Sequence, residues 1–164
     1  MKLVSHIAIG VRDLERSLVF YRDVLGLSEI RDAANEPHRD ALYGPEVTST
    51  RRREVMLRWG GNAGEDFGDR VFLALSQSEE LAENAPLHLG QIGIHHVGLW
   101  VEDVPALAER LRAAGHEPVS VVDTVGTGYG ESADQPMRAM FVKDPDGVVL
   151  QFDERVRPAS PNMP

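Results

Sequence analysis

The sequence predicts an α+β fold built from two tandem βαβββ modules. The main observation is an internal repeat. The phrase VSHIAIGVRDL at Val4–Leu14 is matched by IGIHHVGLWVEDV at Ile92–Val104, with His6 and His96 at corresponding places (96 − 6 = 90). Each copy continues into an amphipathic helix that ends at a glycine, Gly26 or Gly115. Self-similarity at a fixed distance indicates two copies of one supersecondary unit.

The first module is expected to open with a strand over residues 3–11, because its residues alternate between two faces. His6, Ala8 and Gly10 share the face of small residues, and the other face is apolar. Asp13 is the expected N-cap of the helix that follows, with Gly26 at its end. The remaining elements are strands at 27–31, 53–59 and 70–76, a loop at 32–50, a glycine-rich turn at 60–68 and a polar linker at 77–91.

The second module repeats this plan. His96, Gly98 and Trp100 share one strand face, Asp103 caps a helix, and Gly115 ends it. Strands are expected at 118–123, 137–142 and 148–152, with a loop at 124–136 and a tight Asp-Pro-Asp-Gly turn at 144–147. The modules therefore span residues 1–91 (with the linker) and 92–154 of one compact domain, and residues 155–164 form a frayed tail.

Composition restricts the function. The 164 residues carry a net charge of −9, which disfavours nucleic acid and acidic membrane surfaces as partners. No apolar run approaches the length of a membrane span, and the N-terminus lacks the features of a signal peptide. The chain has no cysteine, so disulfides and thiolate ligands are excluded. We expect a cytoplasmic location and a small-molecule partner.

Both repeated histidines lie on strand faces whose neighbours are small, so these strands are expected to line a cleft. Gln151 is a polar residue within an otherwise apolar strand, where an amide needs a bonding partner. Two imidazoles and an amide oxygen can hold a divalent metal ion. The alternative stays open that these are partly buried histidines bonded to the backbone, and that the amide completes a local hydrogen-bond network.

Three segments together resemble the vicinal oxygen chelate superfamily, which includes glyoxalase I, ring-cleaving extradiol dioxygenases and bleomycin resistance proteins. They are HIAIGVRDLERSLVFYRDVLGL, HHVGLWVEDVPALAERLRAAG and FVKDPDGVVLQF, and the resemblance covers roughly residues 3–154. It implies that the paired modules form a curved mixed sheet around a metal ion that chelates vicinal oxygens of the substrate. Modules in this family pair within one chain or between two, so a homodimer is compatible with the resemblance.

The resemblance also implies the ligands. His6 and His96 match the first-strand ligand of each module, and Gln151 stands where the last strand usually supplies glutamate. The fourth position falls at Ala74, which cannot ligate. The pattern of two histidines and one oxygen therefore resembles the dioxygenases somewhat more than the lyases and isomerases. The implied cofactor is a divalent metal ion: Fe²⁺, Mn²⁺, Zn²⁺ or Ni²⁺.

These residues support two hypotheses for function. The first is a metal-dependent enzyme, of the dioxygenase or the lyase/isomerase type, acting on a small oxygenated organic substrate; the second is a metal-free protein that binds or sequesters a small molecule. No catalytic residue is assigned, although Glu54, Asp153 and Glu131 are considered as bases. The expected pocket residues are Trp100, Phe72, Tyr129 and Arg53.

Overall fold

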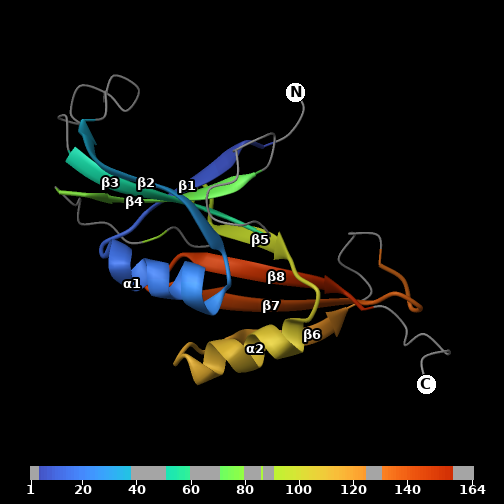
Figure 1. Ribbon diagram of the computed structural model, residues 1–164. Helices are drawn as coiled ribbons and strands as arrows, with labels where there is room; N and C mark the ends of the chain where they lie inside the picture. Colours follow the sequence, from blue (N-terminus) through green and yellow to red (C-terminus); the bar gives the residue numbers. More distant parts are fainter. Residues whose placement is uncertain are drawn as a thin grey trace. The chain divides into compact units, whose positions relative to one another are not determined.

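The structure, a computed structural model, describes residues 4–37, 51–59, 71–79, 86, 91–124 and 131–156. The chain divides into two units, Met1–Asn84 and Ala85–Pro164. The described part of each unit contains one four-stranded mixed sheet and one helical segment (Figure 1). The expected α+β class and the two βαβββ modules are thereby confirmed. The limits of the two modules, and their union in one compact domain, stay predictions.

The first unit runs from strand β1 to strand β4. Strand β1 spans His6–Gly10, β2 Ser28–Pro37, β3 Arg51–Arg58 and β4 Phe72–Ser78. The order in the sheet is β1-β4-β3-β2; β1 and β4 are parallel, and the other pairs are antiparallel. Helix α1, Leu14–Leu18, continues directly into a π-helical segment, η1, at Val19–Val24.

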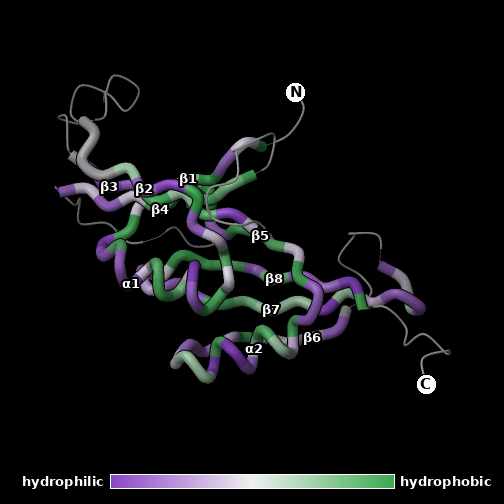
Figure 2. The backbone as a smooth tube through the Cα atoms, viewed as in Figure 1, coloured by the Kyte–Doolittle hydropathy of each residue, from purple (hydrophilic) through white to green (hydrophobic). Residues whose placement is uncertain are grey.

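The second unit has the same topology. Strand β5 spans His96–Trp100, β6 Val119–Thr124, β7 Met137–Lys143 and β8 Val149–Arg155, in the order β5-β8-β7-β6. Strands β5 and β8 are parallel, as β1 and β4 are. Helix α2 spans Val104–Ala113. Along it, apolar residues recur at helical spacing among polar ones (Figure 2).

The two sheets correspond position by position. Ala8 pairs with Ala74 in the first sheet and Gly98 pairs with Gln151 in the second, so Ala74 of β4 corresponds to Gln151 of β8 (151 − 74 = 77). Met56 pairs with Ala74 and Phe141 pairs with Gln151, so Met56 of β3 corresponds to Phe141 of β7 (141 − 56 = 85). A side chain of one unit can therefore be compared with its counterpart in the other. This correspondence separates what the fold requires from what only one unit carries.

Both helices begin in the same way. The side chain of Asp13 accepts a hydrogen bond from Arg16 N at 3.0 Å, and that of Asp103 accepts one from Ala106 N at 2.8 Å. Asp13 and Asp103 thus act as N-caps, as the sequence predicts. Both helical segments are followed by a glycine with a left-handed backbone, with φ of 82° at Gly26 and 83° at Gly115.

A second cap comes from the last strand of each sheet. Gln77 Oε1 accepts a hydrogen bond from Leu14 N at 2.8 Å, and Glu154 Oε2 accepts one from Val104 N at 2.8 Å. These two side chains are counterparts, because 77 + 77 = 154. Both first-turn N–H groups belong to buried residues and would otherwise lack a partner. The fold therefore fixes each helix against its own sheet with a repeated polar contact.

The structure corrects two details. Residues 32–37, expected in a loop, extend β2, because they pair with β3 from Asp32↔Val55 to Pro37↔Arg51. The first helix is not a regular α-helix throughout. From Val19 its turn widens, and Leu25 N donates to Phe20 O at 2.9 Å, five residues back. Residues 38–50, the turn expected at 60–68 and residues 157–164 of the tail lie outside the described residues.

Candidate functional site

The candidate site of the second unit lies on the sheet face that carries His96, Gly98 and Trp100, as the alternation predicts. In the parallel register Gly98 lies beside Gln151, and Trp100 lies beside Asp153. Residues directly opposite each other point to the same side of a sheet, so these side chains share one face. The opposite face carries Val97, Leu150 and Phe152, which belong to the buried core.

Gln151 and Asp153 form a buried pair. Gln151 Nε2 donates a hydrogen bond to Asp153 Oδ1 at 2.8 Å, and both residues are only 8% exposed. Gly98 leaves space beside them, since a Cβ added there would lie 3.8 Å from Asp153 Oδ2. No residue in the described part of the chain donates a hydrogen bond to Gln151 Oε1. The amide nitrogen is therefore held and the amide oxygen is available.

The ring of His96 is held by its neighbour. Its Nδ1 lies 2.7 Å from Nδ1 of His95, and the two ring centroids are 4.7 Å apart. Phe141 adds an edge contact at a centroid distance of 6.5 Å. When His96 Nδ1–H donates to His95, its Nε2 lone pair is left for a ligand. His95 therefore orients His96.

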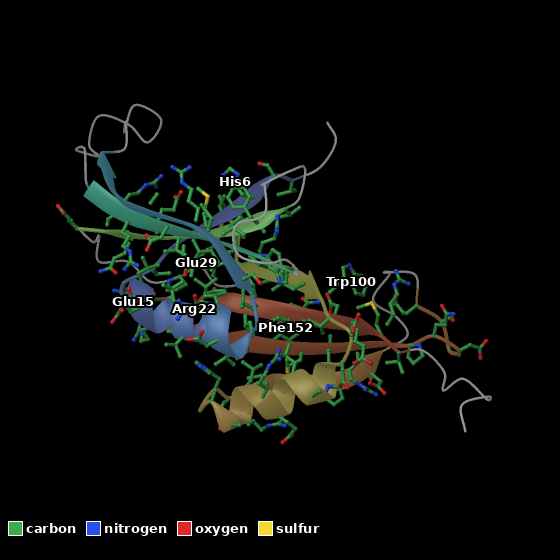
Figure 3. The ribbon with its side chains drawn as sticks, in the orientation of Figure 1. His6, Glu15, Arg22, Glu29, Trp100 and Phe152 are labelled. Carbon is green, nitrogen blue, oxygen red and sulfur yellow. The ribbon has the colours of Figure 1, made fainter. Side chains whose placement is uncertain are left out.

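The first unit carries its own histidine, His6, on strand β1 (Figure 3). Ser5 Oγ lies 3.0 Å from His6 Nδ1, and when His6 Nδ1–H donates to this hydroxyl oxygen, the Nε2 lone pair is left for a ligand. The ring of Phe72 stacks on His6 with centroids 5.0 Å apart and an interplanar angle of 13°. Ala74 lies beside Ala8 and is 2% exposed. The counterpart of Gln151 thus offers no donor atom, as the sequence predicts.

The other expected pocket residues differ in their positions. Trp100 is on the site face and 57% exposed, with the Arg155 guanidinium 5.1 Å from its ring centroid. Arg53 is bound to Asp32 and Glu15, and by the alternation of β3 it lies on the face opposite Met56 and Ala74. Tyr129 lies outside the described residues.

The internal repeat explains the hydrogen bond between Arg53 and Asp32. Its counterpart is Arg138 (53 + 85), which hydrogen-bonds Asp123 on the neighbouring strand as Arg53 hydrogen-bonds Asp32. Hydrogen bonding to these guanidinium groups holds the pKa values of Asp32 and Asp123 below their ordinary value. A contact that occurs in both units belongs to the fold. Arg53 therefore has a structural contact that accounts for its presence.

The three carboxylates considered as bases differ in position. Glu54 lies on the His6 side of the first sheet, where its carboxylate is 3.5 Å from the Arg52 guanidinium. Asp153 lies on the face of His96 beside Gln151. Glu131 precedes the bridge between Ser132 and Gln135 and is half-buried. Among the three, Asp153 alone is hydrogen-bonded to a predicted metal ligand.

The donor atoms fit a divalent metal ion in kind. Imidazole nitrogen and amide oxygen are both known ligands, and each histidine keeps Nε2 free of hydrogen-bond partners in the described part of the chain. Among the described residues, no three His, Asp or Glu side chains form a group that could hold a metal ion. Within its own unit each sheet therefore offers a partial set: one imidazole in the first, and one imidazole with an amide oxygen in the second.

Two βαβββ units, each with a four-stranded mixed sheet, are the arrangement of the glyoxalase fold. The chain belongs to the Glyoxalase/Bleomycin resistance protein/Dioxygenase superfamily, which it matches over residues 3–152. It is 28% identical to lactoylglutathione lyase of Haemophilus influenzae over 154 residues, covering 92% of this chain and 91% of the relative. The lactoylglutathione lyase of Pseudomonas aeruginosa is also 28% identical, with 90% and 80% covered.

Solved structures support the fold. A glyoxalase family protein from Bacillus cereus superposes with a TM-score of 0.71 at 18% identity, and 95% of each chain is covered. The trypanothione-dependent glyoxalase I of Leishmania major gives a TM-score of 0.57 at 23% identity, covering 94% of this chain and 87% of that one. None of the described helices is long and apolar enough to cross a membrane.

Proposed function

We propose that this protein is a divalent-metal-dependent enzyme of the lyase or isomerase type, acting on a small substrate with neighbouring oxygen atoms. His6, His96 and Gln151 would supply the ligands. The observation that carries the proposal is the Gln151 amide, which is buried on the face of His96 with its nitrogen bound and its oxygen free of partners among the described residues. A bound divalent ion would supply Lewis-acid polarisation of a carbonyl oxygen.

The residues of the chain would shape the site around the substrate. His95 and Ser5 orient the two imidazoles, and Gly98 keeps space beside Gln151. The exposed indole of Trp100 offers an apolar surface on the same face. The curated relatives quoted above carry the name lactoylglutathione lyase, which supports lyase chemistry as the first to test. Ring cleavage, which the ligand pattern slightly favours in the sequence, is tested second.

The first experiment measures metal content. We expect about one metal ion per chain after loading with Fe²⁺, Mn²⁺, Zn²⁺ or Ni²⁺, detected by elemental mass spectrometry. The double variant His6→Ala/His96→Ala should lose it. His116, which lies after helix α2, supplies the control His116→Ala, which should bind metal normally. A wild-type protein that binds none of the four ions would refute the metal-dependent mechanism.

The second experiment measures the reaction. The loaded protein is incubated with lactoylglutathione or, for the reverse direction, with glutathione and an α-ketoaldehyde, and the thioester is followed over time. An enzyme accelerates both directions, so the thioester should disappear faster in the first mixture or form faster in the second. Other α-hydroxy thioesters, and catechol with dissolved oxygen, extend the panel. If oxygen is consumed with catechol and no thioester reacts, the result would favour a dioxygenase instead.

A second function is favoured by one specific observation. Ala74 is buried between Ala8 and Met56, at the first-unit position that corresponds to Gln151. A site with one metal-ligand atom fewer suits a protein that binds a small molecule without a metal ion. Under this alternative the protein would bind aromatic or oxygenated ligands with the same affinity in the presence and absence of a chelator, and it would turn none of them over.

A further inference from the structure

We propose that Asp153 is a positioning residue that determines which end of the Gln151 amide is presented to a cation. This inference rests on the proposed function, since it concerns how one of its ligands is prepared. A glutamine side chain has an oxygen end and a nitrogen end of nearly the same shape, and either can face a site. An ionised carboxylate only accepts hydrogen bonds. Beside Asp153, Gln151 must therefore offer its N–H to the carboxylate, which leaves Oε1 for a ligand.

The burial of Asp153 strengthens its preference for this orientation of the Gln151 amide. Asp153 is 8% exposed, and no residue in the described part of the chain forms an ion pair with it. A buried carboxylate that has only a neutral amide as a partner is costly, because it has lost most of its hydration. A cation bound through Gln151 Oε1 would compensate that charge at short range. The pair is therefore suited to a positive ligand rather than to an anion or a hydrogen-bond acceptor.

The other unit shows that the fold does not need the pair. The counterparts of Gln151 and Asp153 are Ala74 and Ser76, since 151 − 77 = 74 and 153 − 77 = 76. Strand β4 pairs with β1 and β3 without them, just as β8 pairs with β5 and β7. The caps and the Arg-Asp contacts, in contrast, occur in both units. A polar pair that only one of two similar sheets carries is best explained by a ligand.

The test uses Co²⁺ alone as the probe, because its visible absorption reports both affinity and coordination. Asp153→Ala should weaken Co²⁺ binding by about 10- to 100-fold, the usual effect of losing a residue that orients a ligand. Asp153→Ala also leaves the buried Gln151 amide nitrogen without its acceptor, so urea unfolding of the variant is measured first and Co²⁺ affinity is compared only under conditions in which it is folded. A residue with a merely structural role would lower stability but leave the Co²⁺ affinity and the absorption spectrum of the folded protein unchanged. Ser76→Ala, at the corresponding position of the first unit, is the matched control and should bind Co²⁺ normally.

A second variant keeps the test decisive if Asp153→Ala does not fold. Gln151→Glu/Asp153→Asn exchanges the two groups, so the pair keeps one carboxylate, one amide and one hydrogen bond, and the carboxylate now lies at the ligand position. It should fold and bind Co²⁺ at least as tightly as the wild type. Gln151→Glu alone places two carboxylates side by side and should be less stable than the exchanged pair.

The outcomes separate this inference from the proposed function. If the wild type binds Co²⁺ and Asp153→Ala binds it equally well, the positioning role is refuted and the metal site stands. If the exchanged pair folds but binds Co²⁺ at least 10-fold more weakly than the wild type, the positioning role is also refuted. If the wild type binds neither Co²⁺ nor any of the four ions of the metal-content experiment, the proposed function fails and the inference fails with it. If it binds one of those four but not Co²⁺, the same variants are compared with that ion, and equal binding by Asp153→Ala refutes the positioning role.

Discussion

Removing the Glu154 side chain should destabilise the second unit through the start of helix α2. Glu154 Oε2 accepts a hydrogen bond from Val104 N at 2.8 Å, and Val104 is fully buried. In Glu154→Ala this N–H would be left without its partner in a place where water does not reach it. Leaving a buried donor unsatisfied costs about 1–3 kcal/mol. Loss of a negative charge at the helix N-terminus adds about 0.3–1 kcal/mol.

The first unit supplies the comparison. Gln77 makes the same bond to Leu14 N with a neutral amide oxygen. Glu154→Gln should therefore keep the hydrogen bond and lose only the charge, including the contact at 3.8 Å with Arg138. We expect a loss of about 2–3 kcal/mol in the free energy of unfolding for Glu154→Ala and of about 0.5–1 kcal/mol for Glu154→Gln.

Urea unfolding followed by circular dichroism measures both effects. With a slope of about 2 kcal/mol per molar urea, Glu154→Ala should lower the midpoint by about 1–1.5 M. Gln77→Ala should show a similar loss, because the first-unit contact is equivalent. The reasoning would be refuted if Glu154→Ala stayed within about 0.5 kcal/mol of the wild type, or if Glu154→Gln were as unstable as Glu154→Ala.

Three further predictions concern stability. Leu111→Ala should cost about 2–5 kcal/mol in chemical denaturation, because Leu111 is fully buried on α2; a change below about 1 kcal/mol would contradict its place in the core. Gly115→Ala should cost about 1–2 kcal/mol, since the backbone φ of 83° is unfavourable for alanine, whereas Gly10→Ala has open space and should be nearly neutral. Arg138 lowers the pKa of Asp123, so their contact stabilises the fold at neutral pH. This contribution begins to be lost when the pH falls to the ordinary pKa of an aspartate, about 4, and it is gone below the lowered pKa of folded Asp123. Asp123→Asn should therefore be less stable than the wild type at pH 7 by no more than about 1 kcal/mol, given the exposed side chain, and the difference should vanish once the pH is below the lowered pKa of folded Asp123.

The order of elements could be predicted because the chain repeats a strong period-two pattern followed by a capped helix. His6 and His96 fall on the predicted faces because alternation in a strand is a local property. The role of His95 could not be predicted by the same argument. Strand β5 begins only at His96, so His95 lies outside the region in which alternation holds.

The contacts that matter most in the candidate site depend on the side-chain conformation. Gln151 and Asp153 are two residues apart on one strand, and spacing predicts only that they share a face. Which end of the amide meets the carboxylate follows from the hydrogen bond itself. The structural assignment of Arg53 likewise needed the register of β3 with β4 and of β7 with β8, which reveals Arg138 as its counterpart.

The parallel pairing of the first strand in each unit has a consequence for synthesis on the ribosome. His6 pairs with Phe72 and His96 pairs with Val149. Each first strand therefore cannot pair until a partner strand far downstream in the sequence has been made. Strands β2, β3 and β4 are joined by antiparallel pairing between consecutive strands and can associate as soon as they emerge. The strand that bears the histidine is the first of its unit to be made but the last to be incorporated, because among the described strands its only partner is the final strand of the unit. Each histidine therefore reaches its native position only when nearly all of its unit has been translated.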